Sequence, residues 1–150
     1  MEEKHPHFPL FLDLTGKSVV VVGGGAIAHR RVETLMAFGA RVTVVTPEWR
    51  QAVVSGVDWK PRPYAIGDLE GAVLAVAATD SRAVNRAVGE EARARNIPVS
   101  VADCAEECTF FFPAVCRSGG LVAGVVGDGS DHKKTARAAQ AIRACLEELI

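Results

Sequence analysis

Long hydrophobic runs are missing from this sequence of 150 residues. Its apolar stretches have the length of β-strands, whereas a helix that crosses a membrane needs about 20 consecutive apolar residues. The first residues, MEEKHPHFPLFLDL, begin with acidic side chains and contain only a brief apolar run, which is unlike a secretory signal peptide. We therefore expect a cytoplasmic protein that does not enter a membrane.

An excess of charge of one sign is also missing. The net charge is −1, which provides no overall attraction to nucleic acid or to an anionic membrane. Hydrophobic residues make up 49% of the chain, which is enough to bury a core. Internal repeats and low-complexity segments are absent from the sequence as well. These features favour a compact globular protein without a nucleic-acid partner.

Cysteine is scarce. The four cysteines are Cys104, Cys108, Cys116 and Cys145. Without a secretory signal we expect no disulfides, and the spacings C-x3-C and C-x7-C of the first three are not usual for zinc. We therefore predict no metal site and interpret these thiols as structural or free. Cys145 has helical spacing to Ile142 and Leu149, which predicts that it lies in the core.

The order of the expected elements predicts an α/β fold. Residues 18–22 (SVVVV) are β-branched after the first position, as in a strand buried on both faces of a parallel sheet. Ser81 or Asp80 is expected to cap the second helix. We expect further strands at 41–46, 72–80 and 97–103, an edge strand with two prolines at 57–64, and helices at 26–38 and 81–96. This order predicts a Rossmann-like parallel sheet with helices on both faces.

A different pattern follows Asp103. Residues 109–115 and 121–126 predict the two strands of a β-hairpin, and a C-terminal helix is expected from 131 to 149. Such a hairpin cannot bury both of its faces by itself. We therefore interpret residues 105–150 as a dimerisation extension of a Rossmann-like domain formed by residues 1–104.

Three glycines join the first strand to the first helix. Residues 23–28 (GGGAIA) match the pattern G-x-G-x-x-G/A between a strand and a helix, which is typical of dinucleotide-binding proteins. Gly23 would permit the tight turn, Gly25 would let the backbone approach a diphosphate, and Ala28 would allow close packing of helix on strand. The start of a helix also offers free N–H groups to an anion. A glycine-rich turn without a ligand is the alternative.

The ends of two other strands supply further candidates. Dinucleotide-binding sheets commonly place an acid near the end of the second strand, where it binds the adenosine ribose. Here Glu48 lies two residues beyond Thr46, which favours NAD, whereas Arg50 would suit the 2′-phosphate of NADP. Residues 77–80 (AATD) end a central strand on the same side of the sheet, where such folds bind ligands.

Asp103 ends the last strand of the expected sheet, also on the ligand side. Its apolar neighbours at 101 and 110–112 would disfavour the charged carboxylate and suit a general base. The alternative is a turn-forming aspartate that bonds to its own loop.

Basic residues open the C-terminal helix, where the helix dipole disfavours cations. His132, Lys133 and Lys134 occupy this first turn, with Asp131, and Ser130 as a possible cap, in partial compensation. The pattern indicates either an anionic ligand, with Arg117 and Arg137 contributing, or a solvated basic face. Both interpretations stay open.

Several segments together resemble one family. They are FPLFLDLTGKSVVVVGGGAIAHRRVETLMAFGARVTVVTP, AVAATD and VSVADCAEECTFFFPAV. Over residues 8–149 the sequence resembles the precorrin-2 dehydrogenase family, which includes the amino-terminal module of siroheme synthase. Pro9, Leu10 and Phe11 before the first strand and a Phe-x-x-Pro-like run after Asp103 are part of this resemblance. A generic Rossmann domain has no reason to carry them.

The resemblance implies NAD-dependent oxidation of precorrin-2 to sirohydrochlorin in siroheme biosynthesis by a homodimer. Asp103 then corresponds to the catalytic candidate, which would remove a proton. The implied cofactor-binding residues are Gly23, Gly24, Gly25, Ala26, Ile27, Thr46, Pro47, Glu48, Ala78 and Thr79. Because the substrate carries many carboxylates, a basic lip is expected from Arg117, Lys133, Lys134 and Arg137.

The sequence departs from the family in two places. Residues 127–132 lack its Ser-Gly-Gly-x-Ser-Pro turn, and Ser100 stands where the family has Asn. Many members also continue into further helices, so iron insertion is not implied here. Two alternatives stay open: a bifunctional dehydrogenase and ferrochelatase, with His132, Cys104 and Cys108 nearest to a metal-handling role, and a non-catalytic NAD-sensing Rossmann module.

Overall fold

The computed structural model describes residues 3–149, which form two compact units. The larger unit is Leu12–Phe110, and the smaller one joins residues 3–11 to residues 111–149. No helix within the described residues is long and apolar enough to cross a membrane. The predicted division into residues 1–104 and 105–150, with dimerisation assigned to the second part, stays a prediction.

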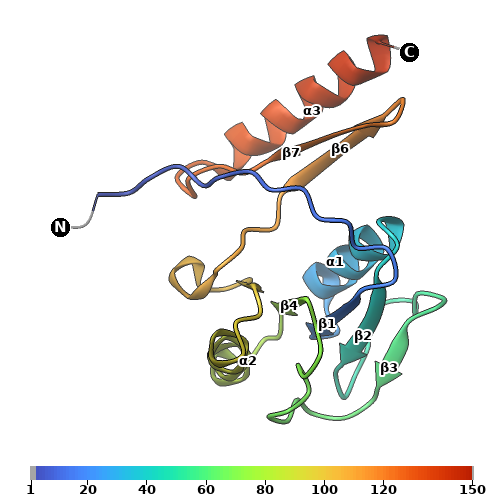
Figure 1. The fold of residues 1–150 in the computed structure, drawn as a ribbon, viewed down its shortest axis with the longest axis vertical. Helices are drawn as coiled ribbons and strands as arrows, with labels where there is room; N and C mark the ends of the chain where they lie inside the picture. The colour runs from blue at the N-terminus through green and yellow to red at the C-terminus, as the bar shows by residue number, and fades with distance from the viewer. Residues whose placement is uncertain (1–2, 150) are drawn as a thin grey trace. The chain divides into compact units, whose positions relative to one another are not determined.

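The larger unit contains a sheet of five parallel strands in the order β3-β2-β1-β4-β5 (Figure 1). The strands are β1 (Ser18–Val22), β2 (Arg41–Val45), β3 (Asp58–Lys60), β4 (Leu74–Ala77) and β5 (Val99–Val101). The strand order reverses between β1 and β4, so this is an open, doubly wound sheet. The predicted Rossmann-like fold is confirmed.

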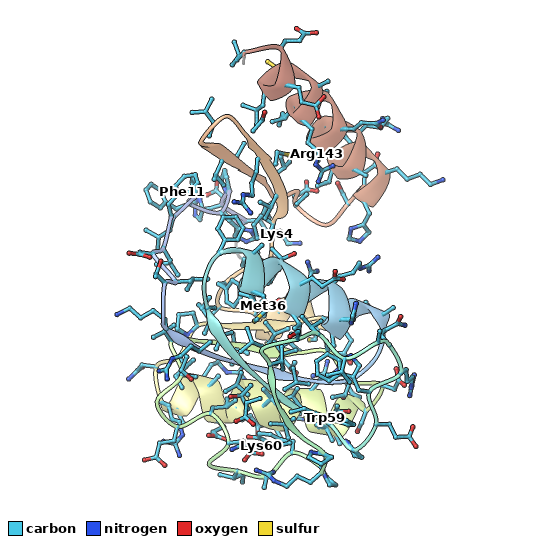
Figure 2. The ribbon with its side chains drawn as sticks, turned by 90° about the vertical axis from the view of Figure 1, so that its right-hand side faces the viewer. Lys4, Phe11, Met36, Trp59, Lys60 and Arg143 are labelled. Atoms are coloured by element: carbon cyan, nitrogen blue, oxygen red, sulfur yellow. The ribbon has the colours of Figure 1, made fainter. Side chains whose placement is uncertain are left out.

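The valines of β1 explain why this strand lies in the centre. All four are at most 4% exposed. Val20 and Val22 share a core cluster with Val88 and Ala92 of helix α2 (Arg82–Ala94). Because side chains alternate along a strand, the other two valines face helix α1 (Ala26–Ala37), which packs on the opposite side of the sheet (Figure 2). Each buried valine contributes about 1.5–3 kcal/mol to the burial free energy.

The helix ends follow local sequence signals. Gly39 has φ +84° and its amide donates to the Met36 carbonyl at 3.0 Å, which ends α1. The hydroxyl oxygen of Ser81 accepts a hydrogen bond from the Val84 amide at 3.2 Å, so Ser81 caps α2. The alternative assignment of this cap to Asp80 is wrong, because Asp80 instead pairs with Arg50.

A buried carboxylate ties the loop after β3 to α2. The side chain of Glu91 is 5% exposed and accepts hydrogen bonds from the hydroxyl of Tyr64 and from the amides of Gly67 and Leu69. Arg95 adds an ion pair at 2.8 Å. Burial raises the pKa of Glu91, but these hydrogen bonds outweigh burial and hold the pKa below its ordinary value. The network positions Tyr64 beside the carboxyl ends of the strands.

The smaller unit is a hairpin covered by one helix. Strands β6 (Ala114–Ser118) and β7 (Leu121–Val125) pair antiparallel, and helix α3 (His132–Glu148) packs on both. The turn uses two glycines with positive φ, Gly119 and Gly120. Cys116 and Ala139 are buried between hairpin and helix, and the Cys116 thiol lies 3.4 Å from the Ala139 carbonyl oxygen.

Three predictions for this region are wrong. Residues 109–113 are not part of β6, because Thr109 exchanges hydrogen bonds with Val99 of β5 in the larger unit. Asp131, and not Ser130, caps α3, since its carboxylate accepts from the Lys134 amide at 3.0 Å. Cys145 is exposed and not in the core, because a single hairpin covers only one face of the helix.

Candidate functional site

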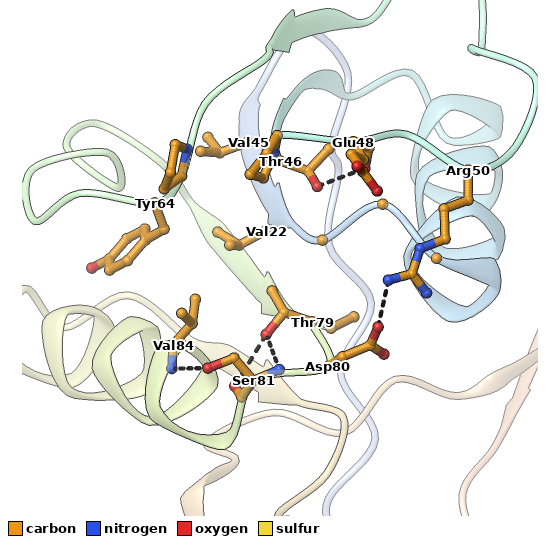
Figure 3. Close-up of a pocket in the computed structure, with 16 residues that line it drawn as sticks. Val22, Val45, Thr46, Glu48, Arg50, Tyr64, Thr79, Asp80, Ser81 and Val84 are labelled. Atoms are coloured by element: carbon orange, nitrogen blue, oxygen red, sulfur yellow. Dashed lines mark hydrogen bonds and ion pairs between the residues drawn. The ribbon is translucent and has the colours of Figure 1, made fainter.

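A pocket of about 340 Å³ lies at the carboxyl ends of β1, β2 and β4 (Figure 3). Open parallel sheets bind ligands at this edge, where the strand order reverses. The residues that line the pocket come from the loops after these strands, from the loop after β3 and from the start of α2. They are Val22, Gly23, Gly24, Gly25, Val45, Thr46, Pro47, Glu48, Arg50, Pro63, Tyr64, Ala78, Thr79, Asp80, Ser81 and Val84.

Two glycines let the loops at the pocket floor approach each other closely. Gly23 has φ +136°, and a Cβ atom on it would overlap the Ala78 carbonyl oxygen. A Cβ on Gly24 would overlap the Glu48 carbonyl oxygen. Hydrogen bonds hold this packing in place, since the Gly23 amide donates to Val45 and the Arg50 amide donates to Gly24 at 2.9 Å. The sequence predicted the turn at Gly23 but missed the packing role of Gly24.

Gly25 differs from its two neighbours because its free side meets open space. It caps α1 with φ −90°, and a Cβ on it would have no atom within 4 Å apart from its neighbours in the chain. No side chain caps the helix, so the first N–H groups of α1 are free to bind an anion. A side chain at residue 25 would fill this space, and the site therefore fits a diphosphate. The predicted residues Ala26 and Ile27 are exposed in this first turn and do not line the pocket.

The loop after β2 is held by Thr46. Its hydroxyl donates to the Glu48 carbonyl at 2.8 Å, and its carbonyl accepts from the Trp59 indole at 3.0 Å. The hydroxyl of Thr46 is thus used to shape the loop, while Pro47 and the exposed Glu48 line the pocket. Glu48 lies where an acid is expected to meet an adenosine ribose.

The loop after β4 is held by Asn85, a residue that sequence reasoning missed. Asn85 is fully buried on α2, and its side-chain oxygen accepts from the Thr79 amide at 3.0 Å and from the Thr79 hydroxyl at 2.7 Å. Its side-chain amide donates to the Thr79 carbonyl at 3.0 Å. The signal for it was one polar residue in helical spacing with the buried Val88 and Ala92. These hydrogen bonds fix the loop so that Ala78 and Thr79 line the pocket.

Arg50 and Asp80 form an ion pair at 2.6 Å between the loops after β2 and β4. Their side chains are 61% and 79% exposed, so the pair lies at the solvent side of the pocket. The hydrogen bond that Arg50 donates to Asp80 and the charge of Asp80, with a smaller contribution from Glu48, raise the pKa of Arg50. Sequence reasoning considered both residues but did not predict that they meet.

Asp103 lies just beyond β5 and does not line the pocket. Its carboxylate pairs with Arg82 at 2.9 Å, and the same guanidinium pairs with Glu107. The side chain of Asp103 is 39% exposed, so the predicted apolar surrounding of this carboxylate is wrong. Desolvation opposes the charge on Arg82, but the charges of Asp103 and Glu107 outweigh it and raise the pKa of Arg82.

The predicted basic residues belong to the smaller unit. Arg117 is on β6, and Lys133, Lys134 and Arg137 are on α3, where all four are exposed. Their role in substrate binding stays a prediction. Across residues 3–149 no three His, Cys, Asp or Glu side chains gather closely enough to hold a metal ion.

The fold and the pocket together define the class of this protein. A glycine turn with free helix N–H groups, at the point where the order of a parallel sheet reverses, is the dinucleotide-binding arrangement of Rossmann-type domains. Residues 10–114 match the family described as "Putative NAD(P)-binding". The chain belongs to this family.

Two relatives with assigned names extend the comparison. The chain is 42% identical to the probable multifunctional siroheme biosynthesis protein HemA of Ruminiclostridium josui over 142 residues, covering 91% of this chain and 28% of that protein. It is 43% identical to siroheme synthase of Azotobacter vinelandii over 137 residues, covering 87% of this chain and 29% of that protein. The chain therefore spans less than a third of the length of these relatives.

A solved structure is similar over most of both chains. The structure of SirC, a precorrin-2 dehydrogenase, matches with a TM-score of 0.74 and 28% sequence identity. The match covers 93% of this chain and 71% of the SirC chain. The similarity therefore includes more than the parallel sheet.

Proposed function

We propose that this chain catalyses the NAD-dependent dehydrogenation of precorrin-2 to sirohydrochlorin. The observation that carries the proposal is the open space beside Gly25, at the start of α1, within a pocket at the carboxyl edge of the sheet. The similarity to SirC, a precorrin-2 dehydrogenase, and to siroheme synthases supports this choice of substrate.

The residues of the pocket divide the task of holding NAD. The N–H groups that begin α1 bind the diphosphate, Glu48 accepts hydrogen bonds from a ribose, and Ala78 and Thr79 border the cofactor from the loop after β4. When bound, NAD accepts the hydride that leaves precorrin-2. Because Gly25 leaves its side of the pocket open, the diphosphate can approach the backbone closely.

Asp103 supplies the second half of the chemistry in this proposal. Removal of two hydrogens from precorrin-2 releases one hydride and one proton, and the Asp103 carboxylate takes up the proton. Arg82 fixes one oxygen of this carboxylate by the ion pair at 2.9 Å. The other oxygen is left for the substrate.

The decisive experiment is an anaerobic assay of NADH formation from precorrin-2, comparing the wild type with Asp103→Asn. The amide keeps the size of the side chain but does not accept the proton, so kcat is expected to fall about a hundredfold or more. Asp58→Asn serves as the control, since Asp58 is an exposed carboxylate on the edge strand β3. Equal rates for Asp103→Asn and the wild type would remove Asp103 from the mechanism.

A homodimer and the basic residues complete the proposal. The smaller unit exposes large apolar side chains, which a second copy would cover. They are Phe8, Leu10, Phe11, Leu121, Val122, Val126 and Leu149.

Arg117, Lys133, Lys134 and Arg137 would meet the carboxylates of the substrate. Sedimentation velocity over a concentration series tests the dimer, and a monomer at all concentrations would exclude it. The cytoplasmic location remains a prediction.

A non-catalytic NAD-sensing module is the second candidate. The observation that favours it is that Asp103 does not line the pocket and is already paired with Arg82. This function requires that NAD binds, that precorrin-2 is not oxidised and that Asp103→Asn leaves NAD affinity unchanged. Turnover of precorrin-2 by the wild type would exclude it.

A further inference from the structure

The ion pair between Arg50 and Asp80 lies in the lining of the dinucleotide pocket. Figure 3 shows the Arg50 side chain extending past the glycine turn to the carboxylate of Asp80, which comes from the opposite loop. The backbone of Arg50 is fixed by its hydrogen bond to Gly24 at 2.9 Å, so its side chain starts at the edge of the turn. Arg50 therefore lies on the same loop as Glu48, beside the place expected for the adenosine ribose and a 2′-phosphate on it.

The charges around the pocket are unequal. Of the residues that line it, Arg50 carries a positive charge, while Glu48 and Asp80 carry negative charges. The Asp80 carboxylate accepts a hydrogen bond from one terminal guanidinium nitrogen of Arg50 at 2.6 Å and so holds the guanidinium on its side of the pocket. A third phosphate would have to separate this pair and would also face the Glu48 carboxylate, which lies on the same loop as Arg50.

We infer that Asp80 is a specificity-determining residue, which occupies Arg50 and thereby makes the pocket select NAD over NADP. The inference deepens the proposed function and rests on its dinucleotide site. An arginine five residues beyond the end of β2 would otherwise bind a 2′-phosphate through two parallel hydrogen bonds. Asp80 takes the place of that phosphate as the partner of Arg50.

Calorimetric titration of the full chain with NAD and with NADP tests this role without requiring turnover. Asp80→Asn removes the negative charge that holds Arg50, and we expect NADP to bind about fivefold more tightly, as for the loss of a competing exposed ion pair. NAD affinity is expected to change less than about twofold. In Asp80→Asn/Arg50→Gln the gain for NADP disappears, because the gain depends on the guanidinium.

A matched variant controls for the removal of a negative charge. Glu90→Gln breaks a similar exposed pair with Arg86 on α2. Neither Glu90 nor Arg86 lines the pocket, so this variant should leave both affinities unchanged. Asp80 is exposed and does not cap α2, so Asp80→Asn is expected to fold, which circular dichroism checks.

The possible outcomes separate the inference from the function beneath it. Unchanged NADP affinity in Asp80→Asn overturns the inference and leaves the dinucleotide site intact. An equal gain for NAD and NADP also overturns it, because Arg50 would then meet the diphosphate that both cofactors share. If the wild type binds neither cofactor, the proposed function fails, and the inference fails with it.

Discussion

Two glycines only two positions apart should respond to the same substitution in opposite ways. At Gly25, φ is −90° and a Cβ meets open space, so Gly25→Ala should not strain the fold. A smaller conformational entropy of the unfolded chain should even raise the free energy of unfolding by about 0.5 kcal/mol. At Gly23, φ is +136° and a Cβ would overlap the Ala78 carbonyl oxygen, so Gly23→Ala must shift the loop after β4.

The magnitudes follow from these environments. Backbone strain and overpacking together should cost Gly23→Ala about 3 kcal/mol, which lowers the melting temperature of a chain of this size by about 6–12 °C. Gly25→Ala should keep the melting temperature of the wild type, but its methyl group fills the open space next to the first N–H groups of α1. Losing one charge-assisted hydrogen bond there should weaken NAD binding about ten- to a hundredfold.

Thermal unfolding by circular dichroism and calorimetric titration with NAD are measured on both variants. The reasoning requires that stability and affinity separate: Gly25→Ala is stable and binds NAD weakly, whereas Gly23→Ala is unstable. A Gly25→Ala protein that binds NAD as tightly as the wild type would refute the placement of the diphosphate at the start of α1. Equal melting temperatures for Gly23→Ala and the wild type would refute the packing argument.

Three further predictions test residues that support the site. Asn85→Ala removes the hydrogen-bond partners of the Thr79 backbone N–H and carbonyl, so the free energy of unfolding in urea should fall by about 1–3 kcal/mol and NAD should bind more weakly. An unchanged urea midpoint would contradict the role of Asn85 in holding this loop. Because Arg82 holds Asp103, Arg82→Gln should lower kcat for precorrin-2 about tenfold without changing NAD affinity, and Arg82→Lys should recover part of the loss. The control Arg86→Gln should have no effect. An unchanged kcat in Arg82→Gln would exclude a positioning role for Arg82. The folded-state pKa of Glu91 lies below its ordinary value of 4.5, so the stability that its carboxylate adds is complete above pH 4.5 and is lost as the pH falls through the folded value. In guanidinium unfolding, the free energy of unfolding should therefore fall more steeply below about pH 4.5 for the wild type than for Glu91→Gln. Parallel pH profiles of the two proteins would contradict this.

Several features of this protein could be predicted because they depend on residues close together in the sequence. The run Val19–Val22 predicts a buried central strand, since such a strand has no polar face to present to water. The glycine turn and the helix that follows also depend on neighbouring residues, and Gly39 and Ser81 end and begin their helices by local hydrogen bonds. These signals were enough to predict the parallel sheet and the place of the pocket.

Other features depend on contacts between distant segments. Tertiary packing brings Asp80 to Arg50 and Asp103 to Arg82, across separations of 30 and 21 residues. The surroundings of Asp103 were predicted wrongly for this reason: its sequence neighbours are apolar, but its partner in space is an arginine. The start of β6 was predicted too early because Thr109, a residue with high strand propensity, bonds back to β5.

The amino-acid sequence by itself determined the strands of the parallel sheet, the glycine turn and the edge of the sheet where a dinucleotide binds, because hydrophobic period and backbone freedom are local properties. Only the tertiary structure decided which charges pair around that edge, and hence that Arg50 is already occupied by Asp80 and Asp103 by Arg82. The physical reason is that a charge–charge interaction depends on distance in space, and folding sets that distance through the packing of the whole unit.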